Sequence, residues 1–165
     1  MTRCASAVRG MLAFALLAAA HLPAGAQSPL DVDLGPGMNE AYISQHGQNQ
    51  RATIEQRNVE GGLLSGAIRQ TGSGNRADML LEGSDLAGSI NQVGNDNAAS
   101  LEVRGTGNRG AVVQSGDANA AGLVVKGYGQ DVTLIQEGGV KTQGAPISIH
   151  SDTPTGQPII IRQWQ

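Results

Sequence analysis

Residues 90–99 read INQVGNDNAA, and residues 112–121 read VVQSGDANAA. The two stretches start 22 positions apart and share one frame, in which an apolar residue is followed by glutamine, glycine, asparagine and alanine at fixed places. Repetition at a fixed period is typical of architectures in which each unit packs on its neighbours. The frame therefore indicates a repeat protein, and it continues in both directions along the chain.

The repeating unit is 11 residues long. Each unit has a seven-residue segment of alternating character and a four-residue link that usually carries glycine at its second place. The link at residues 57–63 is three residues longer, two extra residues precede the tenth segment, and Pro158 interrupts the eleventh. The segments lie at residues 39–45, 50–56, 64–70, 75–81, 86–92, 97–103, 108–114, 119–125, 130–136, 143–149 and 157–163.

The spacing of the apolar residues decides between helix and strand. An 11-residue period also occurs in right-handed coiled coils, but here like residues recur at i and i+2, as on one face of a strand. Glycine inside a helix costs about 1 kcal/mol, whereas it suits a tight turn with positive φ. We therefore expect strands joined by turns, with turn glycines at Gly47, Gly72, Gly83, Gly94, Gly105, Gly116, Gly127 and Gly138.

Alternate segments form two sets. Segments of the first set end in glutamine, with an aliphatic residue two places earlier, as in Ile90 and Gln92. Segments of the second set begin with asparagine or glutamine, followed two places later by alanine, as in Asn97 and Ala99. Because each set is uniform and the sets differ, strand n is expected to stack on strand n+2. The predicted fold is an all-β, amyloid-like β-solenoid with two strands per 22-residue repeat and about five and a half coils.

The amide side chains are predicted to form ladders inside this solenoid. Stacked strands lie about 4.8 Å apart, so that like residues stand directly above one another. A buried amide without partners costs about 1–3 kcal/mol, whereas in a ladder it donates to one neighbour and accepts from the other, as in cross-β assemblies. The expected ladder and assembly residues are Gln45, Gln70, Gln92, Gln114, Gln136, Gln163, Gln50, Asn75, Asn97, Asn119 and Gln143.

The segment at positions 1–26 has the pattern of a secretory signal peptide. Arg3 and Arg9 give a positive n-region before an apolar run at residues 11–20, and residues 24–26 give a small-x-small cleavage site. Cleavage would also remove Cys4, so that no disulfide is expected in the chain from Gln27 onward. That mature chain has a net charge near −5. Nucleic acid, which needs clustered Lys and Arg, is therefore not an expected partner.

The repeats resemble the curlin family, whose members are the subunits of bacterial curli amyloid fibres. The family repeat is Ser-x5-Gln-x4-Asn-x5-Gln, in its looser form apolar-x-Gln-x-Gly-x-x-Asn-x-Ala. Residues 39–149 carry the resemblance, with in-phase copies at 68–77, 90–99 and 112–121, a variant at 43–56 and a degenerate start at 134–138. The chain departs from the pattern because the opening serine is mostly replaced and four second-set segments end in Leu81, Val103, Val125 and Ile149 instead of glutamine.

The resemblance implies secretion through the outer membrane by the curli machinery and assembly into a cell-surface fibre that supports adhesion and biofilm formation. The implied partners are further copies of the chain and a companion curlin subunit, and the chain itself resembles either the major or the minor, nucleating subunit. The first coil, residues 39–56, is expected to be an open, templating edge. Residues 27–38 occupy the place of the secretion-targeting segment, or form a plain leader. Pro146, Pro154 and Pro158 are expected to interrupt the C-terminal end, where residues 150–165 should form an irregular strand or cap.

Other functions have weaker support in the sequence. Catalysis by a paired-carboxylate mechanism needs two acids in one groove, but Glu55, Asp78 and Glu102 are scattered. His46 and His150 are far apart in the chain, so that no metal site is expected. We predict no enzyme activity and no cofactor. A monomeric adhesive solenoid is the remaining alternative to a fibre, and it would need caps on both end strands.

Overall fold

The structure is a computed structural model that describes residues 30–34, 38–59, 61–139, 146–154 and 157–164. The predicted signal peptide and the predicted ladder residue Gln143 lie outside the described residues. Throughout the described ranges the regular elements are strands, which confirms the all-β prediction. These ranges contain no helix with the length and hydrophobicity needed to cross a membrane.

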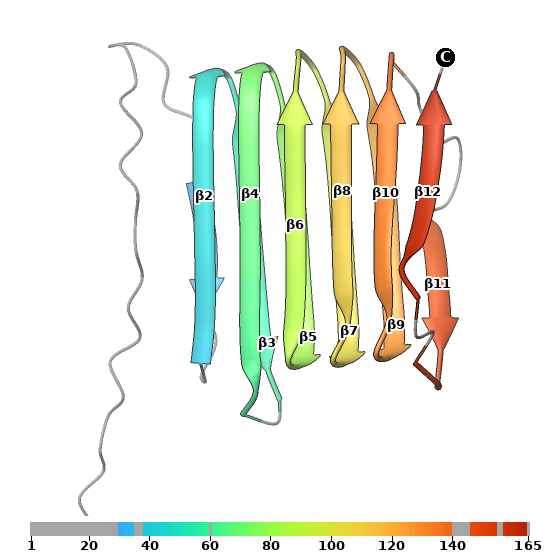
Figure 1. Ribbon diagram of the computed structural model, residues 1–165. Coiled ribbons are helices and arrows are strands. Elements are labelled where there is room, and N and C mark those ends of the chain that lie inside the picture. Colours follow the sequence, from blue (N-terminus) through green and yellow to red (C-terminus); the bar gives the residue numbers. More distant parts are fainter. Residues whose placement is uncertain (1–29, 35–37, 60, 140–145, 155–156, 165) are drawn as a thin grey trace, which may run out of the picture.

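The fold consists of two six-stranded sheets, and the strands within each sheet run parallel to one another (Figure 1). The odd sheet consists, in spatial order, of β1 (Leu30–Leu34), β3 (Arg51–Asn58), β5 (Arg76–Ser84), β7 (Ala98–Thr106), β9 (Ala120–Tyr128) and β11 (Ile147–Ser151). The even sheet consists of β2 (Met38–Gln48), β4 (Leu63–Ser73), β6 (Leu86–Val93), β8 (Arg109–Ser115), β10 (Asp131–Glu137) and β12 (Ile159–Trp164).

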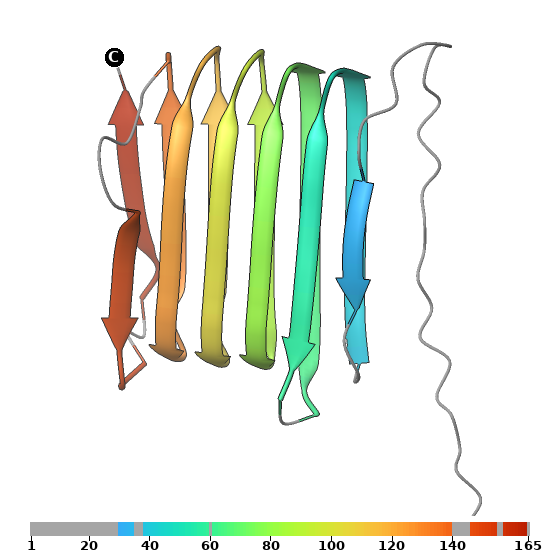
Figure 2. The same cartoon turned by 180° about the vertical axis from the view of Figure 1, so that it is seen from behind.

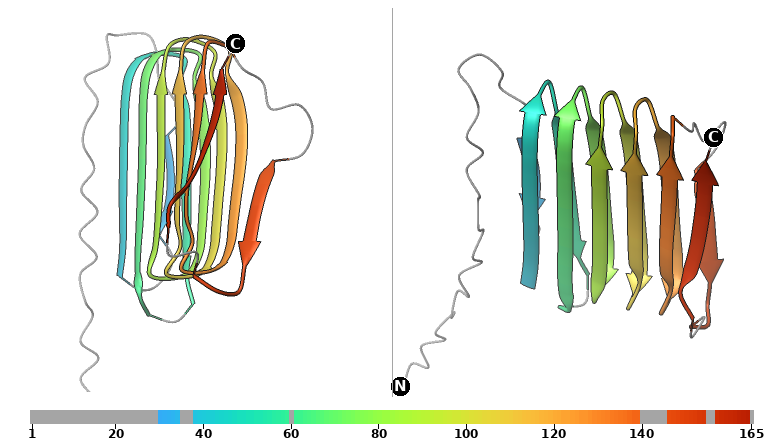
Figure 3. Two further views of the ribbon diagram at one scale, coloured as in Figure 1. Left: turned by 45° about the vertical axis from the view of Figure 1, so that its right-hand side comes forward. Right: turned by 45° about the horizontal axis from the view of Figure 1, so that its top comes forward.

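Consecutive strands alternate between the two sheets, so that strand n pairs with strand n+2. Figure 3 shows the sheets as two layers connected by turns at both ends of the strands. Ile90 pairs with Ile68 on one side and with Val112 on the other, each one full repeat away along the chain. The predicted β-solenoid and its stacking order are therefore confirmed.

The two sheets enclose a thin core whose described side chains include no aromatic residue. Leucine, isoleucine and valine from both sheets are fully buried, and they face small residues across the core. A Cβ atom added to Gly88 would lie 2.8 Å from Leu81 Cδ2 and 2.8 Å from Met79 Sδ. Gly110 has the same relation to Leu101 and Val103. These glycines let the sheets approach closely, as packing at interior density requires.

The turns repeat one backbone conformation. All eight predicted turn glycines have positive φ, between 84° and 143°. A Cβ atom on Gly72 would overlap the carbonyl oxygen of Gly94 in the next coil, and one on Gly94 would overlap that of Gly116. The last residue of several links is also left-handed, including Asp96 with φ 53° and Ala118 with φ 55°. Glycine at the second place is therefore required both by φ and by the close passage of stacked turns.

The irregular links are absorbed without a change of register in the strands. The link before β4 is longer than the others, and Gln45 still pairs with Gln70. Asn58 holds this link, since its Oδ1 accepts from Gly61 N at 2.8 Å and its Nδ2 donates to Gly62 O. At the other end, Gln136 pairs with Gln163 although the interval between them exceeds one repeat. The columns of like residues thus survive the insertions.

The ends of the solenoid differ from the prediction in two respects. β1 lies in the segment expected to be a leader, and it pairs in parallel with β3 (Figure 2). The first coil therefore does not expose β3 as a free edge, which corrects the expectation that all of residues 39–56 are open. At the C-terminal end, Pro146 and Pro158 precede β11 and β12 instead of interrupting them. The tenth predicted segment, residues 143–149, contributes β11 from Ile147 onward, and its residues 143–145 lie outside the described residues.

Candidate functional site

The first ladder is a continuous chain of glutamine hydrogen bonds along the even sheet. Each Nε2 donates to the Oε1 of the next glutamine toward the C-terminus, at distances of 2.7 or 2.8 Å. The four inner members have at most 1% exposure, and the two end members are half-buried. The chain runs through six predicted residues, Gln45, Gln70, Gln92, Gln114, Gln136 and Gln163.

The same amides also join the two sheets. Gln92 Nε2 donates a second hydrogen bond to the backbone oxygen of Arg76 at 2.9 Å, and Gln114 Nε2 donates to that of Ala98 at 2.9 Å. Arg76 and Ala98 begin strands of the odd sheet. Both amide hydrogens therefore form hydrogen bonds, one along the stack and one across the core, so that the buried amide donors of this column are satisfied without water.

The second ladder lies at the turns that lead into the odd sheet. Asn97 Nδ2 donates to the oxygen of Gly116 in the next coil at 2.8 Å, and Asn97 Oδ1 accepts from the backbone N of Asn119 at 2.9 Å. Asn75 makes the matching bonds to Gly94 and Asn97. These contacts satisfy turn carbonyls and amides that would otherwise be buried without partners.

Gln50 takes the first place of this second ladder, where the sequence has glutamine instead of asparagine. It is fully buried, and its Nε2 donates to the oxygen of Gly72 in the next coil at 2.8 Å and to that of His46 at 3.1 Å. Asn75 bonds Gly94 and Thr71 in the same way. The longer side chain therefore keeps the contact that joins successive turns.

A third polar column at the opposite turns was not predicted. Asn108 Nδ2 donates to the oxygens of Arg104 and Gly127, both at 2.7 Å, and its Oδ1 accepts from Gln130 N at 2.8 Å. Leu64 and Leu86 separate Asn108 from Asn39, the first residue of this column, which hides the column in the sequence. The available signal is the pair of amide residues, one repeat apart, at the start of two successive first-set segments.

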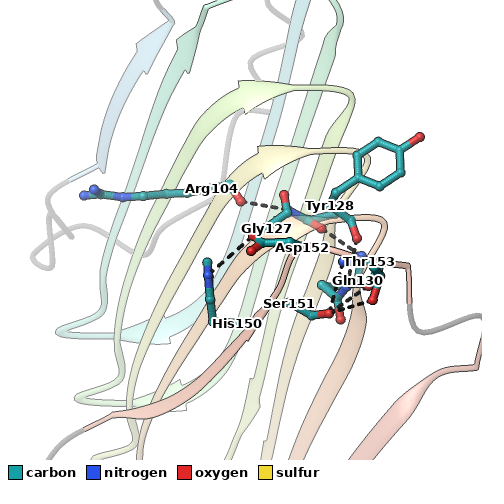
Figure 4. A network of polar contacts seen from close by, with 9 residues as sticks. Arg104, Gly127, Tyr128, Gln130, His150, Ser151, Asp152 and Thr153 are labelled. Atoms are coloured by element: carbon teal, nitrogen blue, oxygen red, sulfur yellow. Dashed lines mark hydrogen bonds and ion pairs between the residues drawn. The ribbon is translucent and has the colours of Figure 1, made fainter.

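Gln130 ties the last two turns on this side together (Figure 4). Its Nε2 donates to the oxygens of Tyr128 and Thr153, both at 2.8 Å. Ser151 Oγ also donates to Thr153 O at 2.8 Å, and His150 lies 3.5 Å from Asp152. The C-terminal coil is thus held to the body of the solenoid by side-chain contacts as well as by strand pairing.

Gln56 is followed in its column by aliphatic residues. Its successors along the stack are Leu81, Val103 and Val125. Gln56 is fully buried and its Nε2 donates to Glu40 O at 2.8 Å, while its Oε1 has no hydrogen-bond partner among the described residues. An amide column therefore does not form at this position.

The outer face of the odd sheet carries charged side chains in neighbouring rows. Glu102 pairs with Arg104 at 2.9 Å and with Lys126 at 3.3 Å, and Arg104 also lies 3.4 Å from Glu82. These side chains are partly exposed, so that each pair contributes little to stability. In the part of the chain that the structure describes, no group of three or more His, Cys, Asp or Glu side chains is placed to hold a metal ion.

The fold and the ladders define a parallel β-solenoid whose interior is held together by stacked amides. In comparisons with known proteins, no family model, curated protein or solved structure matches the chain. The relation of the repeats to curlin therefore stays a prediction from the sequence.

Proposed function

We propose that the protein is a structural subunit of extracellular, curli-type amyloid fibres. It polymerises by stacking one solenoid on the next, and the fibre supports adhesion and biofilm formation. One observation carries the proposal: the two end strands of the even sheet present the same column residues. Ile43 and Gln45 on β2 occupy the register positions that Ile161 and Gln163 occupy on β12.

Among the described residues, the N-terminal end of the even sheet is a long edge strand, β2. β2 has 11 residues and pairs, within the described residues, with β4 alone. Gln45 Nε2 donates to Gln70 Oε1 at 2.7 Å, and Gln45 is the first glutamine of the chain because β2 is the end strand of the described sheet. A long edge strand with unpaired backbone groups is a template for another chain. Each glutamine in the chain donates from its Nε2 toward the C-terminal end. A strand added beside β2 must therefore present a hydrogen-bond donor to Gln45 Oε1.

The C-terminal end also keeps strands that can pair. Pro146 and Pro158 lie just before β11 and β12, where proline removes no N–H group from the strand itself. Ile160 and Trp164 on the outer side of β12 are 57% and 72% exposed. Large apolar side chains on an end strand favour burial against a partner over permanent contact with water.

Assembly in solution tests this proposal. The chain from Gln27 onward is expected to form thioflavin-positive fibres after a lag, with a reflection at about 4.8 Å along the fibre axis. Sonicated fibres should abolish the lag, because they supply ready-made end strands. A chain that stays monomeric for days at high concentration would instead support the adhesive monomer and reject the fibre.

The choice between the major and the nucleating subunit needs a separate measurement. Substoichiometric amounts of this chain would be added to a companion curlin subunit. If the chain is the major subunit, its monomer leaves the lag of the companion unchanged, whereas a nucleating subunit shortens it.

A further inference from the structure

The number of strands in the repeat region constrains how two copies can be joined. The sequence predicts eleven segments, which correspond to β2 through β12. Successive strands alternate between the sheets, so that a set of eleven begins and ends in the even sheet. If β2 of a second copy is stacked on β12, the even sheet continues without interruption.

The odd sheet would not continue in such a stack. Each sheet advances by one strand per coil, so that one position would be vacant between β11 and β3 of the next copy. The separation of these two strands would be about 9.6 Å, twice the normal spacing. The facing backbone N–H and C=O groups of both strands would then have no partner inside the fibre, and such unpaired groups are unfavourable.

β1 lies beside β3 in the odd sheet, at the position that would otherwise be empty between β3 and β11 of the preceding copy. Its residues pair in register with β3, from Leu30 with Ala52 to Leu34 with Gln56. With β1 included, the described residues contain twelve strands, six in each sheet. The series of described strands then begins in the odd sheet and ends in the even sheet, so that a second copy can continue both.

We propose that residues 30–34 are a joining strand, and that its partner is β11 of a second copy of this chain. The interaction surface consists of β1 and β2 at one end and of β11 and β12 at the other. The inference rests on the proposed function, because it concerns the joint between fibre subunits. It assigns a structural role to a segment that carries no repeat.

The registers fix the pairs at this joint. In the odd sheet, Ile147 stands in the column of Ile54 and Val32, so that it would pair with Val32 of the next copy. Ser148 would correspondingly pair with Asp33 of the next copy. Through Ile149 and Leu34, the two strands overlap over three positions.

The even sheet supplies a longer overlap of six positions, from Ile159 with Ala41 to Trp164 with His46 of the next copy. On the outer face, exposed Ile160 would lie beside Tyr42 of that copy. The joint therefore gives a contact to the apolar side chains that β12 exposes, in addition to continuing the glutamine chain.

Deletions test the parity of the strands. Removal of residues 30–34, or of residues 159–164, leaves eleven strands, and we expect the critical concentration for fibre growth to rise about tenfold or more. Removal of both leaves ten strands, which again continue both sheets, with Gln136 stacked on Gln45 of the next copy. This double deletion is expected to grow better than the chain lacking residues 30–34 alone. Circular dichroism and gel filtration would check that each variant keeps a β-rich monomer.

Disulfide capture tests the contact itself in the chain from Gln27, which lacks Cys4. Fibres grown from an equal mixture of Asp33→Cys and Ser148→Cys chains should yield a covalent dimer on oxidation, while each variant alone should not. The matched control replaces Asp33→Cys by Glu55→Cys, the residue that would lie beside Ser148 if β3 met β11 directly. It should yield no dimer.

The outcomes separate the two proposals. If the unaltered chain forms no fibres, the proposed function is rejected and the joining strand with it. If fibres form but the chain without residues 30–34 grows equally well, or only the Glu55→Cys mixture is captured, the joining strand is rejected and the fibre function stands.

Discussion

Gln92 donates a hydrogen bond of 2.8 Å to Gln114, one repeat further along the chain, and the same Nε2 bonds Arg76 O across the core. Gln92 also accepts from Gln70 at 2.7 Å. Each inner glutamine repeats this arrangement, so that the polar column has a direction from the N-terminal to the C-terminal end. The ladder therefore stabilises the coil and, at its ends, specifies which atom an added strand must present.

Gln92→Ala is expected to destabilise the folded chain by about 2–4 kcal/mol, because it leaves the Oε1 of Gln114 and one donor of Gln70 unpaired in the core. Chemical denaturation of the monomer would measure the free energy of unfolding. Arg109→Ala is the control, since Arg109 is exposed on the outer face. The same pair of variants should differ in assembly, with Gln92→Ala the slower. Equal unfolding midpoints and equal assembly rates would contradict the ladder.

Gly88→Ala is expected to destabilise by about 1–3 kcal/mol, because the added methyl group overlaps Leu81 and Met79 across the core. The backbone of Gly88 does not have positive φ, so that the effect reports overpacking alone. Ser89→Ala, on the exposed side of the same strand, is the matched control and should change stability by less than about 0.5 kcal/mol. A neutral Gly88→Ala would show that the sheets can move apart freely.

Ala118→Gly is expected to stabilise the chain by about 0.5–1 kcal/mol, because Ala118 has φ 55°, which is unfavourable for an L-residue with a side chain and costs glycine nothing. Its side chain is exposed, so that little packing is lost. Ala111→Gly within β8 should have the opposite effect, since glycine weakens a strand interior. Thermal unfolding of both variants would show whether their changes have opposite signs.

Glu102→Gln is expected to have a small, salt-dependent effect. Glu102 contacts Arg104 and Lys126 on the partly exposed face of the odd sheet, so that the loss should be below about 1 kcal/mol. It should vanish near about 1 M salt, where the Debye length is about 3 Å. A larger loss, or one that persists in high salt, would show that this charged face stabilises the fold more than its exposure suggests.

The repeat made most of the fold predictable. The interval between Gln92 and Gln114 fixes which residues share a column, and glycine at the second link place fixes the turns. The insertions at residues 57–63 and before Gln163 were also placed correctly, because the columns resume in phase on both sides of them. Asn108 and Gln130 were missed since two leucines interrupt their column, and periodicity is visible only where the same residue type recurs.

The open ends were the least predictable part of the molecule. Gln56 looked like a column residue, yet its neighbours along the stack are aliphatic and its Oε1 has no partner among the described residues. The prolines at 146 and 158 looked like interruptions, but they precede strands that still pair. An end strand has a repeat unit on one side only, so that the repeat pattern does not predict which segment pairs with its other edge.

The sequence by itself determined the period, the stacking of strand n on strand n+2 and the burial of the glutamine column, because these follow from local alternation repeated at a constant interval. Only the tertiary structure decided that residues 30–34 join the odd sheet and that each amide of the glutamine chain donates toward the C-terminal end. The physical reason is that both depend on which groups face each other across strands far apart in the chain, a relation that no local pattern contains.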